Sequence, residues 1–199
     1  KKLKLLTKNE FEKSINFKLN KKNILITFHP VTLEKNTSRE QFQELLNAIN
    51  ELEDTNIIFT KTNSDLNGKI VNQMIDQYTS EYPKKSIGFT SLGQLKYLSA
   101  LQYVDAVVGN SSSGLLEAPS FKIGTINIGD RQKGRIKASS VIDCKPKKNL
   151  ISSALAELYS TKFLKTLKTS INPYGDGHTS QKIINKIKKI NLKTILKKS

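Results

Sequence analysis

The sequence is short of cysteine, histidine and long apolar runs, and each shortage excludes a kind of protein. The single cysteine, Cys144, excludes an intramolecular disulfide and fits a reducing compartment, so we expect a cytoplasmic protein. One cysteine and two distant histidines, His29 and His178, cannot form a standard zinc site, so we expect no metal. No apolar run approaches the roughly 20 residues that span a bilayer, and we therefore expect no membrane partner.

Two common sequence motifs are also absent. No Gly-x-Gly-x-x-Gly follows the first expected strand, which argues against a dinucleotide, and we expect no cofactor. Gly-x-Ser-x-Gly is missing as well, so hydrolysis by a Ser-His-Asp triad has no support.

Positive charge is abundant, but arginine is scarce. The formal charge is +16, from 33 basic and 17 acidic residues, yet the only arginines are Arg39, Arg131 and Arg135. Nucleic-acid readers depend on arginine for bidentate contacts, so we interpret the charge as a lysine-biased composition and expect no nucleic-acid partner. The alternative, a nucleic-acid-binding or non-catalytic nucleotide-binding module, predicts steep salt dependence and no preference for uridine.

Short β-rich runs alternate with amphipathic segments along the chain. We expect strands at 23–28, 56–60, 86–90, 104–109, 124–129 and 139–144. We expect helices at 37–52, 68–80, 91–103, 113–121 (which Pro119 should end or kink), 149–168 and 178–195. This alternation predicts an α/β fold, a doubly wound parallel sheet of Rossmann-like type.

The chain divides into three parts by composition. Residues 1–22 are lysine-rich and weakly patterned, and we interpret them as a connector from a missing N-terminal domain, since the sequence begins at a lysine. Residues 23–180 form the expected Rossmann-like domain, and 181–199 form a basic C-terminal helix or tail.

Polar residues follow the expected strands, at the edge where such sheets bind ligands. They are His29 after the first strand, Asn63 after the second, 90–91 after the third, 110–114 after the fourth and 130–135 after the fifth. Because the carboxyl ends of parallel strands share one edge, we expect these loops to form one cleft.

The serine run Ser111–Ser113 opens a helix, where free N–H groups and partial positive charge suit a phosphate. Its simpler interpretation is an ordinary N-cap. Glu117, one turn later, could accept both hydroxyls of a ribose or simply favour the helix start. Together these residues indicate a nucleoside diphosphate. Arg131 and Arg135 would neutralise it, bond the carbonyls of the loop, or remain solvated.

Four segments in this order, FHPVTLE, FTKTNSD, VVGNSSSGLLEAPSFKIGTINIGDRQKGR and NPYGDG, resemble the hydrolysing UDP-N-acetylglucosamine 2-epimerases, which begin sialic-acid synthesis. The likeness covers about residues 21–185. It implies a GT-B-like enzyme of two Rossmann-like domains facing a cleft, of which this chain is the second. It also implies a UDP-sugar substrate and a homo-oligomer when intact.

The resemblance implies roles for particular residues. His29 and Arg131 would serve catalysis beside the diphosphate, where histidine alternatively has a structural role. The residues implied in UDP binding are Asn63, Leu92 (through its backbone), Tyr97, Ser111, Ser112, Ser113, Gly114 and Glu117. Tyr97 would lie by the uracil, although packing in the core is the simpler interpretation of a lone helical aromatic.

The implied reaction has two steps. UDP leaves by anti-elimination from C1 and C2, giving 2-acetamidoglucal, and water then adds to give N-acetylmannosamine. The family's catalytic carboxylates belong mostly to the first domain, so we expect this chain alone to bind UDP weakly without turnover. Two alternatives remain open: an epimerase of UDP-2,4-diacetamido-2,4,6-trideoxyglucose for legionaminic-acid-type sugars, and a GT-B glycosyltransferase that uses the same UDP pocket.

Overall fold

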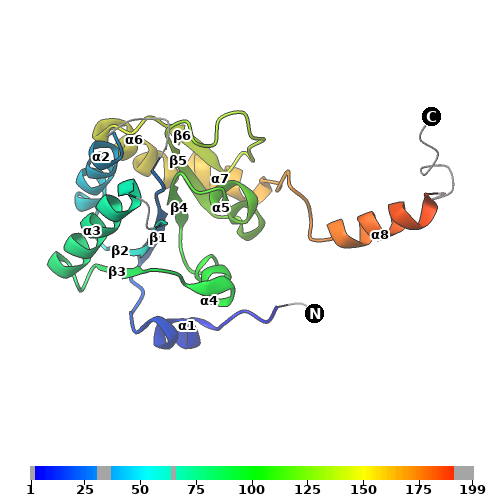
Figure 1. Cartoon of the computed structure of the whole chain (residues 1–199), viewed down its shortest axis with the longest axis horizontal. Helices are drawn as coiled ribbons and strands as arrows, with labels where there is room; N and C mark the ends of the chain where they lie inside the picture. Colours follow the sequence, from blue (N-terminus) through cyan, green and yellow to red (C-terminus); the bar gives the residue numbers. More distant parts are fainter. Residues whose placement is uncertain (1–2, 31–36, 64–65, 191–199) are drawn as a thin grey trace.

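The computed structural model describes residues 3–30, 37–63 and 66–190, so residues 31–34 of the FHPVTLE segment, Ser64, Asp65 and the end of the tail (191–199) lie outside the described residues. A six-stranded parallel sheet in the order β3-β2-β1-β4-β5-β6 organises the chain (Figure 1). The strands are β1 (Lys22–Thr27), β2 (Thr55–Thr60), β3 (Ser86–Phe89), β4 (Ala106–Gly109), β5 (Gly124–Ile128) and β6 (Val141–Cys144). The predicted doubly wound α/β fold is confirmed.

Helices cover both faces of the sheet because successive strand residues point to opposite sides. On β1, Ile24 and Ile26 enter one core, and Leu25 enters the other. The helices that pack on the first face are α2 (Ser38–Asn50), α3 (Leu66–Glu81), α6 (Lys148–Leu158) and α7 (Thr161–Thr169). The second face carries α1 (Lys8–Ile15), α4 (Gly93–Ala100), the short α5 (Ser113–Leu116) and the 3₁₀ turn η1 (Ala118–Phe121).

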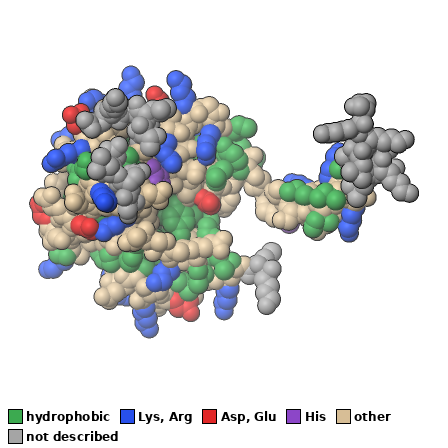
Figure 2. Space-filling view, viewed as in Figure 1, with side chains coloured by type: hydrophobic (Ala, Val, Ile, Leu, Met, Phe, Trp, Pro, Cys, Tyr) green, Lys and Arg blue, Asp and Glu red, His purple; other side chains and the backbone are tan. Residues whose placement is uncertain are grey.

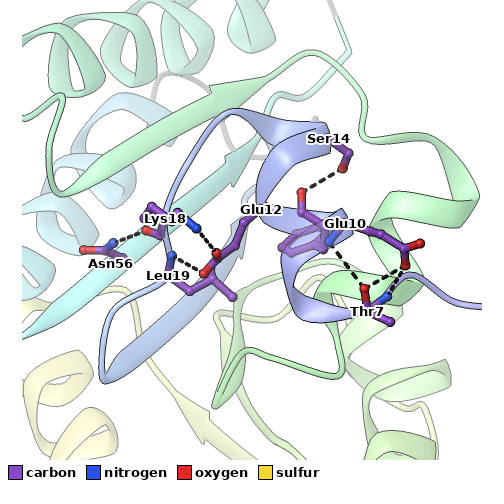
Figure 3. A network of polar contacts seen from close by, with 8 residues as sticks. Thr7, Glu10, Glu12, Ser14, Lys18, Leu19 and Asn56 are labelled. Carbon is purple, nitrogen blue, oxygen red and sulfur yellow. Dashed lines mark hydrogen bonds and ion pairs between the residues drawn. The ribbon is translucent and has the colours of Figure 1, made fainter.

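The segment expected as a lysine-rich connector contains a helix that belongs to the core. Thr7 caps α1 through a capping box with Glu10, and Phe11 and Ile15 are buried against α4 and the sheet. Figure 3 shows how the following turn is fixed, because the buried Glu12 carboxylate accepts from Lys18 Nζ at 2.7 Å and from the Leu19 N–H at 3.1 Å. The core thus begins before residue 23, whereas the link to a preceding domain stays a prediction.

Two predicted helices differ in length from those found. The helix expected at 149–168 is two helices, because Ser160 stops α6 and its hydroxyl caps α7 by accepting from the Phe163 N–H at 3.2 Å. The helix expected at 113–121 is a single turn, α5, followed by η1, and Pro119 lies at the start of η1 as predicted for a break.

The last described helix, α8 (Thr179–Lys189), stands apart from the body of the molecule (Figure 1). None of its residues is buried, and it presents Ile183, Ile184 and Ile187 to solvent beside several lysines, the green and blue of the arm in Figure 2. Among the described residues, no helix has the length and apolarity that crossing a membrane would require.

Candidate functional site

The order of the strands places a crevice between β1 and β4. The chain runs outward from β1 to β3 on one side and from β4 to β6 on the other, so these two neighbouring strands form a topological switch point. Their backbones approach closely at the carboxyl end, where Thr27 pairs with Gly109. Gly109 has φ +129°, and a Cβ there would lie 2.1 Å from the Thr27 carbonyl oxygen, so only glycine fits.

A cavity of about 550 Å³ opens at this edge, within the size range of small-molecule sites. We call it the switch-point cavity. Five residues that the sequence analysis proposed for UDP line it: Leu92, Tyr97, Ser111, Ser113 and Glu117. The other lining residues are Thr27, Thr60, Lys61, Thr90, Ser91, Gly93, Gln94 and Leu98.

The turn after β4 supplies donors to this cavity. Within the described residues, the main-chain N–H groups of Ser111 and Ser112 have no hydrogen-bond acceptor. The helix behind them, α5, is only four residues long, so its dipole is smaller than we expected from the sequence. An anion here would depend on individual N–H and hydroxyl groups rather than on a long helix.

Gly114, expected to contact the diphosphate, has a packing role. Its Cβ would lie 2.6 Å from Thr125 Cγ2, and Thr125 Oγ1 donates to its carbonyl at 2.7 Å. The absence of a side chain therefore allows α5 to lie directly on β5. This close contact fixes the position of the serine turn.

Glu117 carries the most unusual polar atom of the cavity. Its Oε2 is buried and has no hydrogen-bond partner among the described residues. A buried, unpaired carboxylate oxygen is costly, and a ligand hydroxyl would satisfy it. Glu117 Oε2 is therefore a hydrogen-bond acceptor that a ligand donor could pair with.

Tyr97 lines the cavity and is half-buried, so its proposed place beside the uracil stays a prediction. Its hydroxyl is hydrogen-bonded to the Ser113 Oγ, which joins α4 to α5 across the cavity. Burial and the nearby Glu117 carboxylate raise the pKa of Tyr97 to about 12, so the hydroxyl stays protonated. Asn63 is exposed and is not among the residues that line the cavity.

The two residues expected to serve catalysis flank the cavity without lining it. His29 is half-buried after β1, and its Nδ1 lies 2.8 Å from Thr62 Oγ1. Arg131 donates from Nη1 to the Asn110 carbonyl at 3.0 Å, which is the loop-holding alternative of the sequence analysis. Partial burial, with repulsion from Arg135, lowers the pKa of Arg131 from its usual value.

The sequence analysis placed Asn110 and Gln132 in the loops of the cleft but gave neither a role, although both hold the site. Gln132 is 1% exposed and donates from Nε2 to the same Asn110 carbonyl at 2.7 Å. The side chain of Asn110 in turn pairs with the main chain of His29. An asparagine directly after the run Val-Val-Gly was the available signal, since a polar amide there is unlike the buried strand before it.

The NPYGDG loop supports the cavity from behind. Asn172 Nδ2 donates to the Leu116 carbonyl at 2.8 Å and to Ser120 Oγ at 2.7 Å, which ties the loop to α5 and η1. Tyr174 donates to the carbonyl of Ile136 at 3.0 Å. In the described part of the chain, no cluster of three or more His, Cys, Asp and Glu residues could hold a metal ion.

Comparison with known proteins assigns the chain to a family. The sequence model described as UDP-N-acetylglucosamine 2-epimerase matches residues 2–188. The chain belongs to this family. It is 40% identical over 200 residues to the GDP/UDP-N,N'-diacetylbacillosamine 2-epimerase (hydrolyzing) of Campylobacter jejuni, covering 100% of this chain and 52% of that protein. It is 34% identical over 115 residues to the UDP-N-acetylglucosamine 2-epimerase of Neisseria meningitidis, covering 58% of this chain and 29% of that protein.

Solved structures of the epimerase family share the fold. S. aureus MnaA, in a co-structure with UDP, has a TM-score of 0.70 at 19% identity, covering 92% of this chain and 48% of that one. The N. meningitidis UDP-GlcNAc 2-epimerase bound to UDP-GlcNAc has a TM-score of 0.68 at 19% identity, with the same coverage of 92% and 48%. The chain thus spans about half the length of the epimerases that it matches.

Proposed function

We propose that this chain is the nucleotide-binding half of a hydrolysing UDP-sugar 2-epimerase. The observation that carries the proposal is the switch-point cavity, which Ser111, Ser113 and Glu117 line and where the Oε2 of Glu117 has no partner among the described residues. An acceptor for two adjacent hydroxyls beside donors for an anion matches a ribose that carries a diphosphate. Family membership supports the same assignment.

The proposed site divides the work among its residues. Ser111, Ser112 and Ser113 would bind the diphosphate, and Glu117 would bind the ribose. The backbone near Leu92 would face the uracil, a place that we also proposed for Asn63 from the sequence; Asn63 would need to move to reach the cavity. Tyr97 would lie by the uracil and hold Ser113 through its hydroxyl.

The reaction would break the C1–O bond to UDP while a base removes the proton from C2, and water would then add to the unsaturated sugar. This half would stabilise the negative charge on departing UDP through the serine turn, His29 and Arg131. Gln132 and Arg131 support this role by holding the Asn110 carbonyl at the start of the turn. The base would come from the other half, so this chain alone would bind UDP without turnover.

Two sugar substrates fit the proposal. One is UDP-N-acetylglucosamine, which would give N-acetylmannosamine for sialic acid. The other is UDP-2,4-diacetamido-2,4,6-trideoxyglucose, which is favoured by relatives in C. jejuni and in Legionella pneumophila, at 40% and 32% identity, that are named N,N'-diacetylbacillosamine 2-epimerases. Product analysis of the intact enzyme with each sugar would separate them, and transfer to an acceptor would indicate a glycosyltransferase instead. We also propose a cytoplasmic homo-oligomer for the intact protein.

Calorimetric titration of the chain with UDP and CDP, at low and high salt, tests the binding proposal. CDP differs from UDP only in the base, so the comparison isolates the uracil. We expect UDP to bind more tightly, and Glu117→Ala to weaken it about 10- to 100-fold, because charged hydrogen bonds to the ribose are lost.

Glu157→Ala is the matched control, because it removes an exposed carboxylate on α6, on the opposite face of the sheet. It should leave the affinity for UDP unchanged. Equal affinity for UDP and CDP that collapses with salt would mean that the lysines attract any polyphosphate, and it would refute the proposed site.

A further inference from the structure

Two asparagine side chains each hold the main chain of a residue that follows a strand. The Asn110 amide accepts from the N–H of His29 and donates to its carbonyl, both at 2.7 Å. The Asn72 amide, on α3, accepts from the N–H of Thr62 and donates to its carbonyl, both at 3.0 Å. Each amide takes the place of a neighbouring strand, so both residues are held as though the sheet continued.

The two held residues meet through their side chains. His29 Nδ1 and Thr62 Oγ1 are 2.8 Å apart. Thr62 is only 7% exposed, so its hydroxyl proton needs an acceptor within the protein. In the described part of the chain, His29 Nδ1 is the hydrogen-bond partner that this hydroxyl has.

We propose that Thr62, held by Asn72, is a positioning residue for His29. The Thr62 hydroxyl donates to Nδ1, so the neutral imidazole carries its proton on Nε2. The second nitrogen of the ring is then a donor rather than a lone pair, which suits the anionic oxygens of a diphosphate. This inference rests on the proposed function, which places His29 beside departing UDP.

The residues that hold His29 come from both sides of the switch point. Asn110 belongs to the loop after β4, whereas Asn72 belongs to the helix after β2, and His29 follows β1 between them. The main chain of His29 is therefore held by Asn110 and its ring is held by Thr62. Loss of the Thr62 hydroxyl would remove one side and leave the main-chain pairing with Asn110 in place.

Nitrogen-15 NMR of the imidazoles tests this assignment without any nucleotide. The chain has two histidines, and the exposed His178 serves as an internal reference. The spectra would be recorded at about pH 8.5, where the tautomer of a neutral imidazole can be distinguished. We expect His29 in a single form protonated at Nε2, with Nδ1 as a hydrogen-bonded acceptor.

Thr62→Val removes the hydroxyl at nearly constant size, and Thr62→Ser keeps it. Valine should move the nitrogen shifts of His29 toward the exchange-averaged pattern of His178, and serine should retain those of the wild type. In UDP titrations, valine should cost about fivefold in affinity, as expected for one hydrogen bond of about 1 kcal/mol, and serine should cost little.

Three outcomes would overturn the proposal: a wild-type His29 protonated at Nδ1, shifts that do not respond to Thr62→Val, or an unchanged affinity of that variant for UDP. If Thr62→Val fails to fold, the wild-type spectrum alone still decides the tautomer. Because the spectra contain no UDP, a failure of nucleotide binding is distinguishable from a failure of this assignment.

Discussion

At the amino ends of β1 and β4 the buried polar groups pair with one another, whereas at the carboxyl ends several have no partner. The amino-end group, which we call the Asp105 network, joins Asp105 to the Asn23 N–H at 2.8 Å and to the Tyr159 hydroxyl at 3.4 Å. At the other end, the buried Oε2 of Glu117 and Oε1 of Gln132 lack partners among the described residues. Around these two strands, the polar groups are thus paired at the amino ends, whereas two buried oxygens near the carboxyl ends have no partner among the described residues.

This difference separates stability from function. Paired polar groups stabilise a fold, and unpaired buried groups cost free energy unless a ligand satisfies them. Changes in the Asp105 network should therefore lower stability without altering affinity for UDP. Changes at the unpaired Glu117 should instead lower affinity for UDP without lowering stability.

Gly109→Ala should have the largest effect, because it breaks the join between β1 and β4 on which both ends depend. The new Cβ would overlap the Thr27 backbone, so we expect a loss of about 4 kcal/mol or more in the free energy of unfolding. Chemical denaturation followed by circular dichroism measures it.

Gly129→Ala is the control for that substitution. Gly129 also has a positive φ, +74°, but a Cβ there would meet no atom within 4 Å, so only backbone strain of about 1–2 kcal/mol should appear. Equal losses in the two variants would contradict the steric account.

Asp105→Ala should come next, because it leaves the buried N–H of Asn23 without its acceptor. We expect a loss of about 1–3 kcal/mol in the free energy of unfolding and an unchanged affinity for UDP. Weakened binding of UDP in this variant would mean that the two ends of the sheet are coupled rather than separate.

Asp105→Asn sharpens the same point through pH. Burial raises the pKa of Asp105 above its usual value, so the folded state binds this proton more tightly than the unfolded state. The contribution of Asp105 to stability is therefore present at acid pH and falls as pH rises through its folded pKa. The Asn23 N–H keeps an acceptor in Asp105→Asn. The free energy of unfolding of this variant should therefore rise relative to that of the wild type between acid and neutral pH. A difference in unfolding free energy that stays constant with pH would contradict this.

Glu117→Gln should show the opposite behaviour at the carboxyl end. Neutralising a buried carboxylate oxygen that has no partner should leave the free energy of unfolding unchanged or raise it. Affinity for UDP should fall about tenfold, since a charged acceptor for the ribose is lost. Denaturation tests the expected stability, and calorimetry tests the expected affinity. A variant that is destabilised but binds UDP with full affinity would contradict the assignment of Glu117 to the binding site.

Tyr97→Phe should have the smallest effect, because it removes one hydroxyl bonded to Ser113. We expect a loss of about 1 kcal/mol in the free energy of unfolding and a modest decrease in affinity for UDP. Because the folded pKa of Tyr97 is raised to about 12, the wild type should lose stability as pH rises from its usual value of 10.0 toward 12. The variant should lack this part of the decline. Identical profiles of unfolding free energy against pH would contradict a raised pKa for the Tyr97 hydroxyl.

The strands could be predicted from the sequence more readily than the helices. Buried parallel strands are short apolar runs with polar residues after them, which the chain displays clearly. The helix α1 was missed because it is short and lysine-rich, and Phe11 and Ile15 are the apolar residues that it buries. The break between α6 and α7 depends on one serine cap, which a continuous helical pattern conceals.

The candidate site was predictable where one loop carries it. Ser111, Ser113 and Glu117 are close in sequence and lie together in the cavity. The pairing of Thr62 with Asn72 depends on the direction in which α3 leaves the sheet. The hydrogen bond from Gln132 to Asn110 joins two different loops. Contacts of this kind arise from tertiary structure, so no local sequence pattern predicts them.

The measurement that tests the central claim most directly is amide chemical-shift mapping of the chain with UDP. The account predicts saturable shifts at Leu92, Ser111 and Ser112, with none in the Asp105 network at the other end of the sheet. Shifts that gather on the lysines of α8, or that spread evenly over both ends of the sheet, would contradict a nucleotide site at the switch point.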